Sequence, residues 1–97
     1  MVELKQLTIG HTNALGISIM LPRGTISMIL KENMIVCDSA IDIEALVSKY
    51  PQICIIQSSH GPLYQDILEG HIIHCSKEAI KQGVCLEMKI YDALTLL

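Results

Sequence analysis

Apolar and polar residues alternate with a period of two along the first part of the chain. Residues 2–9 are apolar at 2, 4, 7 and 9, and within 15–21 one face is apolar at 15, 17, 19 and 21. This alternation is typical of β-strands. Two more apolar runs, 25–30 and 34–37, follow turn-forming segments at 22–24 and 31–33. Four strands joined by short turns predict an antiparallel meander.

After residue 37 the spacing of apolar residues becomes helical. Asp38 and Ser39 are residue types that cap helix N-termini, and Pro51 ends the pattern. Residues 52–57 form a β-branched apolar run, which predicts a central strand buried on both faces. A strand–helix–strand unit has a right-handed crossover, so strands 34–37 and 52–57 are expected to be parallel.

The remaining segments predict shorter elements. Pro62 opens a helix that ends at Gly70, residues 71–75 form a strand, and Ser76 caps a helix that runs to Gly83. The tail fits two structures, because residues 84, 86, 88 and 90 alternate as in a strand, whereas 90, 93, 94 and 97 have helical spacing. We favour an extended link to about residue 88, followed by a terminal helix.

These elements predict one α+β domain spanning 1–97. An antiparallel strand meander is followed by a β-α-β crossover, giving a mixed sheet with helices packed on it. The composition is 51% hydrophobic and only 18% charged. A domain of this length hides such an apolar surface poorly, so we expect a homo-oligomer, most simply a two-fold dimer.

Charge and aromatic content argue against several classes of function. The net charge is −3, and Phe and Trp are absent, so the chain lacks the basic surface and stacking rings of a nucleic-acid binder. No apolar run is long enough to span a membrane. The N-terminal residues lack the layout of a signal peptide, so a cytoplasmic location is expected. The four cysteines are expected to stay reduced: Cys37, Cys54, Cys75 and Cys85.

The candidate site lies at the carboxyl ends of the two parallel strands. Such ends meet at one edge of a mixed sheet, where ligands often bind. The first strand leads into a group of polar residues: Cys37, Asp38, Ser39 and Asp42. The second strand leads into a loop of four residues: Ser58, Ser59, His60 and Gly61.

Two hypotheses about function stay open at this point. The protein is a non-catalytic module that binds a small ligand or a protein near this edge, or it is a small enzyme with Cys37 as nucleophile and His60 as base. His71, His74 and Cys75 do not predict a metal site, because residues 71 and 75 of a strand lie about 13 Å apart and residue 74 faces the other way. No cofactor motif is present.

Several short patches of the sequence form a further pattern: Leu21-Pro22, Ile35-Val36-Cys37, Asp42 to Leu46, Asp66 to Glu69, Ser76, Ala79, Gly83-Val84, Met88 and Ala93-Leu94. In these patches the chain resembles a family of small uncharacterised bacterial and archaeal proteins typified by YunC. The chain departs from the family's pattern at Asp38, Pro62-Leu63, Glu87 and Ile90. The resemblance implies a small α+β fold without an established activity.

Overall fold

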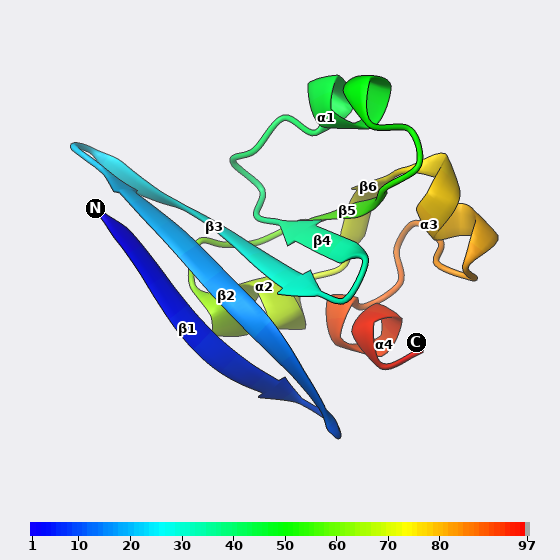
Figure 1. The fold of residues 1–97 in the computed structure, drawn as a ribbon, viewed down its shortest axis with the longest axis horizontal. Coiled ribbons are helices and arrows are strands. Elements are labelled where there is room, and N and C mark those ends of the chain that lie inside the picture. The colour runs from blue at the N-terminus through cyan, green and yellow to red at the C-terminus, as the bar shows by residue number, and fades with distance from the viewer. Residues whose placement is uncertain (97) are drawn as a thin grey trace.

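The computed structural model describes residues 1–96 as one six-stranded sheet with four short helices (Figure 1). Leu97, the last residue of the predicted helical tail, lies outside the described residues. The strands are β1 (Val2–Ile9), β2 (Thr12–Leu21), β3 (Gly24–Lys31), β4 (Met34–Cys37), β5 (Cys54–Ser58) and β6 (Ile72–Cys75). The helices are α1 (Glu44–Lys49), α2 (Tyr64–Glu69), α3 (Lys77–Lys81) and α4 (Ile90–Thr95).

The order of the strands in the sheet is the order of the strands in the chain. β1 to β4 form an antiparallel meander, and the connection through α1 then places β5 parallel to β4, with Val36 opposite Ile56. β6 returns antiparallel to β5. The predicted α+β class, meander and parallel crossover are therefore confirmed.

Helices cover both faces of the β4–β5 region. Alternate side chains of a strand point to opposite faces, so these two strands contribute to two separate clusters. Val36 and Ile56 belong to a large buried cluster that also contains residues of α2, α3 and α4. Cys37 and Ile55 belong to a smaller cluster beneath α1, where Ile43 is also buried. In Figure 1, α1 stands apart from the other three helices. The prediction that β5 is buried on both faces is confirmed, since all five of its residues are buried.

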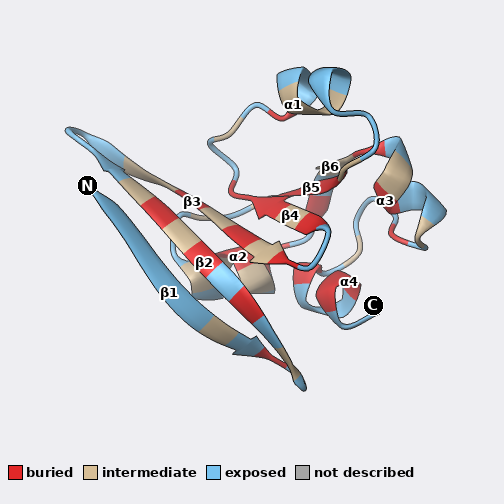
Figure 2. Ribbon diagram, in the orientation of Figure 1, coloured by how far each residue is buried: buried red, intermediate tan, exposed pale blue. Residues whose placement is uncertain are grey.

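The N-terminal half of the sheet is much less covered. β1 is the edge strand and is coloured as exposed along most of its length in Figure 2. Val2 is 61% and Leu4 is 64% exposed, and their neighbours on the same face of β2, Ile17 and Ile19, are only half-buried. Part of the exposed apolar surface therefore lies on β1 and β2, and the rest is spread over other elements, where Leu63, Ile80 and Leu86 are more than half exposed.

Two helices begin later than the sequence predicts. Asp38 and Ser39 do not cap α1, because this helix starts at Glu44. Its N-cap position is Ile43, whose side chain makes no capping hydrogen bond. Pro62 does not open α2, which starts at Tyr64. Before α1, the Asp38 carboxylate accepts a hydrogen bond from the Ala40 N–H, and before α2 the N-cap position is Leu63, which makes no capping hydrogen bond.

Two predictions for the C-terminal part of the chain are confirmed, the Ser76 cap and the terminal helix. The Ser76 side chain accepts a hydrogen bond from the Ala79 N–H at 3.2 Å and caps α3 as predicted. Residues 84–88 form no strand, and the terminal helix that we favoured follows from Ile90. The link before it contains a turn instead of the expected extended chain, since the Met88 N–H donates to the Cys85 carbonyl at 3.3 Å. No helix within residues 1–96 has the length and apolar character needed to cross a membrane.

Candidate functional site

The ends of β4 and β5 lie side by side. Cys37 is opposite Gln57 in the parallel register. The loop after β5 then turns back against the end of β4, because a Cβ atom placed on Gly61 would lie 2.4 Å from the Cβ of Asp38. The two predicted segments, 37–39 and 58–61, are thus adjacent.

Asp38 is buried and organises the backbone at this junction. Its carboxylate accepts hydrogen bonds from the N–H of Ser27 at 2.6 Å and the N–H of Ala40 at 2.7 Å. The buried amide of Gln57, which no sequence pattern marked as a site residue, donates to the carbonyl oxygens of Asp38 and Ser39 at 3.3 and 3.5 Å. These bonds hold the chain between β4 and α1 against β3 and β5.

Cys37 has no access to solvent. Its side chain lies in the cluster beneath α1, and burial, followed by the neighbouring Asp38 carboxylate, raises the pKa of the thiol to about 11. The thiolate is the reactive form of cysteine, so this environment opposes nucleophilic chemistry at neutral pH. Within residues 1–96 no hydrogen bond joins Cys37 to His60.

The other predicted site residues are spread along the two loops. Ser39 and Asp42 are exposed, and the Asp42 carboxylate accepts a hydrogen bond from the Glu44 N–H at 3.1 Å. Ser58 is buried and donates to the Ile67 carbonyl at 3.0 Å, which ties the loop to α2. Ser59 Oγ lies 2.6 Å from His60 Nδ1 and 3.4 Å from His71 Nδ1 at the surface.

A groove runs beside this junction, between β1 and α2, and consists of two hollows that share Lys5 and Tyr64. The first, of about 310 Å³, is lined by Glu3, Lys5, Ser18, Met20, Thr25, Ser27, Pro62, Leu63 and Tyr64. The second, of about 410 Å³, is lined by Lys5, Leu7, Tyr64, Gln65, Leu68, Glu69, Lys89 and Tyr91. Pro62 and Leu63 continue the predicted loop 58–61, so the groove adjoins the predicted site.

A chain of three hydroxyl groups ends at the centre of the groove. Ser18 Oγ lies 2.9 Å from Ser27 Oγ and donates to the Tyr64 hydroxyl at 2.7 Å. Because a serine hydroxyl has one proton, Ser27 must donate to Ser18, and the Tyr64 proton is left to donate elsewhere. The Tyr64 ring also requires Gly16, where a Cβ would lie 2.7 Å from a ring carbon.

Charge and apolar surface meet in the second hollow. Lys5 and Lys89 bring two positive charges against the single carboxylate of Glu69, while Leu7 and Leu68 supply apolar walls. A pocket with apolar walls and a few convergent polar groups is the usual form of a small-molecule site. Tyr64 and Ser18 were not predicted as site residues; the only sequence signals are a polar residue within an alternating strand and one of three aromatic residues.

Comparison with known proteins supports the fold. No protein-family model matches the chain, and no curated protein matches its sequence. The crystal structure of a protein of unknown function, TA1206 from Thermoplasma acidophilum, is similar with a TM-score of 0.85 and 15% sequence identity, over 98% of this chain and 91% of that one. An uncharacterised archaeal protein thus shares this α+β fold, whereas the narrower resemblance to the YunC-typified family stays a prediction.

Proposed function

We propose that this protein is a binding module that holds a small molecule in the groove on either side of Tyr64 and that it works as a homo-oligomer. The observation that carries the proposal is the Tyr64 hydroxyl, whose proton is left to donate between two hollows. The predicted loops support this groove, since Asp38 fixes the backbone of Ser27 and Gly61 leads into the wall formed by Pro62. Direct ligand contacts by Ser39, Asp42, Ser58 and Ser59 stay predictions.

The groove favours a ligand with an apolar body and one acidic group. A volume of about 410 Å³ lies within the usual range for small-molecule pockets. The apolar body would pack between Leu7 and Leu68, and a carboxylate would accept hydrogen bonds from Tyr64 and one of the two lysines. Hydrogen bonds to charged groups are among the stronger ones, about 1.5–3 kcal/mol each.

A titration with benzoate tests the groove directly. Amide chemical shifts of the labelled protein should move for residues lining the groove. Tyr64→Phe should weaken binding about tenfold, because it removes the hydroxyl that would donate to benzoate and that accepts from Ser18. Tyr50→Phe is the matched control, since Tyr50 is exposed beside α1. Unchanged affinity in Tyr64→Phe, or an equal loss in both variants, would contradict the proposal.

The alternative function, a thiol enzyme with Cys37 as nucleophile and His60 as base, has less physical support. The thiol is inaccessible and its pKa is raised. The groove proposal needs neither group, so thiol labelling separates the two functions.

The free edge of β1 supports the homo-oligomer. Met1 and Met20 exchange backbone hydrogen bonds across β1 and β2, and such pairs alternate along antiparallel strands. Val2, Leu4 and Gln6 therefore direct their N–H and C=O groups toward the free edge. An exposed strand edge of this length is a template for pairing with another chain.

Charge complementarity favours a second copy as the partner. When two β1 strands pair antiparallel about Leu4, residues whose numbers add to 8 lie opposite each other. Glu3 of each copy then faces Lys5 of the other, and Leu4 faces Leu4. A register centred on Lys5 instead would place two lysines opposite each other, which is destabilising.

Charge reversal tests this register without altering the core. Glu3→Lys or Lys5→Glu alone should weaken the dimer about tenfold, as measured by light scattering over a dilution series, because like charges become opposed. The double variant should restore the wild-type midpoint. A strictly monomeric wild-type protein at high concentration, or a double variant as weak as the single ones, would contradict the pairing.

A further inference from the structure

Four polar side chains from three separate segments meet at the surface beyond β5. Ser59 and His60 follow β5, His71 precedes β6, and Glu87 precedes α4. Ser59 Oγ lies 2.6 Å from His60 Nδ1 and 3.4 Å from His71 Nδ1, and His71 Nε2 lies 3.7 Å from Glu87 Oε2. We propose that Ser59 is a nucleophile, with His60 as its general base, in a site that hydrolyses small carboxylic esters.

The hydrogen bonds leave the serine hydroxyl proton able to point at His60 Nδ1. A hydroxyl carries one proton and two lone pairs. The backbone N–H of His71 donates to Ser59 Oγ at 3.1 Å and takes one lone pair. The short contact to His60 Nδ1 then carries the hydroxyl proton, provided that the imidazole proton lies on Nε2. A serine whose proton already points at a histidine nitrogen is arranged as an activated nucleophile.

His71 and Glu87 have a positioning role behind this pair. The His71 ring faces the Glu87 carboxylate through Nε2, at 3.7 Å, and the serine oxygen through Nδ1, at 3.4 Å. Both contacts are long, as catalytic hydrogen bonds often are before substrate binds. Negative charge that develops near Ser59 during attack would be stabilised by an N–H on the Nδ1 of His71.

The backbone is shaped to bring these groups together. A Cβ on Gly70 would lie 2.4 Å from Ser58 Oγ and 2.9 Å from Ser59 Oγ, so only glycine leaves room for the cluster. The β5–β6 pairing shifts register between Gln57 and Ser58, and such irregularities are frequent beside active sites. Glu87 has φ of +72°, a strained conformation for a non-glycine residue of the kind that concentrates at functional sites.

The reaction balances with water as the second substrate. Ser59 Oγ forms a bond to the ester carbonyl carbon while its proton moves to His60 Nδ1. The bond to the alcohol oxygen then breaks, and the leaving alkoxide takes that proton from His60. Water next attacks the acyl-serine, gives a proton to His60, and releases the acid; the proton returns to Ser59 Oγ.

The surroundings favour small esters with good leaving groups. His60, His71 and Glu87 are all exposed, and none of the three lines either hollow of the Tyr64 groove. The inference goes beyond the proposed binding function and does not depend on it. Loss of benzoate binding and loss of ester hydrolysis can therefore be observed separately.

Hydrolysis of 4-nitrophenyl acetate by the purified protein is the test. We expect one acetyl group per chain on the peptide that contains Ser59, trapped at low pH and located by mass spectrometry. Ser59→Ala and His60→Gln should each lower the rate about 100-fold, which is the usual contribution of a general base. His11→Gln is the matched control, because His11 is an exposed histidine in the β1–β2 turn.

Each other outcome overturns the inference. An acetyl group on a different residue, or on none, excludes Ser59 as the nucleophile. A rate that falls equally in His60→Gln and His11→Gln reflects ordinary surface imidazole chemistry. If Ser59→Ala does not fold, since its oxygen also binds the His71 N–H, the exposed His60→Gln variant and the location of the acetyl group still decide the question.

Discussion

Gly61 lies against Asp38 so closely that a Cβ atom on Gly61 would be 2.4 Å from the Cβ of Asp38. This contact joins the residue that follows β4 to the loop after β5. It also fixes where Pro62 enters the wall of the Tyr64 groove. The spatial meeting of the two loops therefore depends on the absence of one side chain.

Gly61→Ala should destabilise the protein by several kcal/mol. Its φ of +155° is unfavourable for other residues, and the new methyl group would overlap a buried side chain, which typically costs about 1–3 kcal/mol by itself. Urea denaturation measures the loss. Gly24→Ala is the control, because nothing lies within 4 Å of a Cβ at that position. Equal stability of the two variants would show that the loops are not in contact.

Asp38→Ala should destabilise the fold by about 2–4 kcal/mol. The substitution leaves the N–H groups of Ser27 and Ala40 without their acceptor, and each such bond to a charged group contributes about 1.5–3 kcal/mol. Asp42→Ala removes an exposed carboxylate with a single bond to the Glu44 N–H, so it should cost under about 1 kcal/mol. Similar losses in a urea titration would mean that Asp38 is not a structural residue.

The sheet was predictable because the strands carry their own signals. The uninterrupted apolar run of β5 reflects two covered faces. The alternation of β2 indicated a strand but not its buried face, because Ala14, Gly16 and Ser18 are buried, whereas the apolar positions 15, 17, 19 and 21 are exposed or half-buried. Both patterns are local in sequence. The meeting of residues 38 and 61 followed from the parallel pairing of β4 and β5. The order of the elements and the parallel pairing were therefore enough to predict that the loops after β4 and β5 are adjacent.

The detailed chemistry was not predictable, because it depends on distant partners. Asp38 has a side chain suited to a helix cap, yet one of its oxygens accepts a hydrogen bond from the Ser27 N–H of β3, eleven residues earlier. Tyr64 becomes a groove residue only because Gly16 and Ser18 lie beneath it. Likewise His71 meets Ser59 only through the β5–β6 pairing.

Thiol labelling should follow exposure. Cys85 is exposed and should react first with iodoacetamide at pH 8, whereas Cys37 and Cys54 are buried and have pKa values raised to about 11, chiefly by burial. At pH 8 a thiol with that pKa is ionised in roughly one molecule in a thousand. Peptide mapping after timed labelling measures the order. Rapid labelling of Cys37 in the folded protein would instead support the alternative function, a thiol enzyme with Cys37 as nucleophile.

Stability should fall as the pH rises from about 9 to about 11. The folded chain keeps the protons of Cys37 and Cys54 up to about pH 11, whereas the unfolded chain loses them near the ordinary value of 9.0. The unfolded state then binds fewer protons, so the free energy of unfolding decreases with pH. Urea midpoints across this range measure the slope, and Cys37→Ala should make it shallower. A slope unchanged in that variant would exclude Cys37 as a source.

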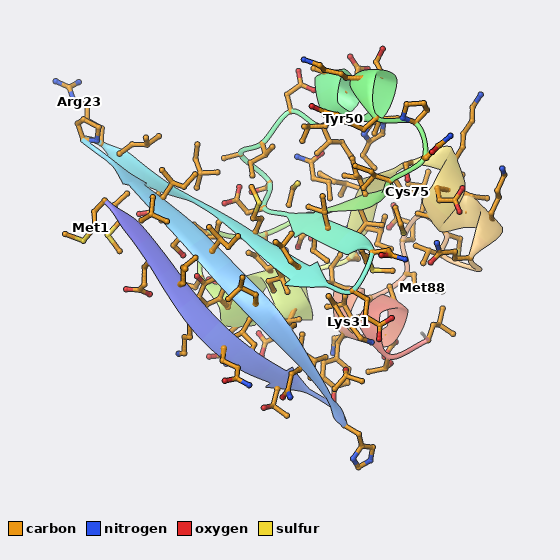
Figure 3. All side chains as sticks on the ribbon, in the orientation of Figure 1. Met1, Arg23, Lys31, Tyr50, Cys75 and Met88 are labelled. Atoms are coloured by element: carbon orange, nitrogen blue, oxygen red, sulfur yellow. The ribbon has the colours of Figure 1, made fainter. Side chains whose placement is uncertain are left out.

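Lys31 should contribute to stability through the C-terminal end of α4. Lys31 is only 3% exposed, its ammonium donates to the carbonyl of Leu94, and Figure 3 shows Lys31 beside that helix. Lys31→Met keeps most of the side-chain volume but removes a charged donor from the last turn, where positive charge is favourable. We expect a loss of about 1.5–3 kcal/mol in urea denaturation. Lys49→Met, at an exposed position in the last turn of α1, should change stability by less than about 0.5 kcal/mol. If the two variants lose equal stability, the buried ammonium is not what anchors α4 to β3.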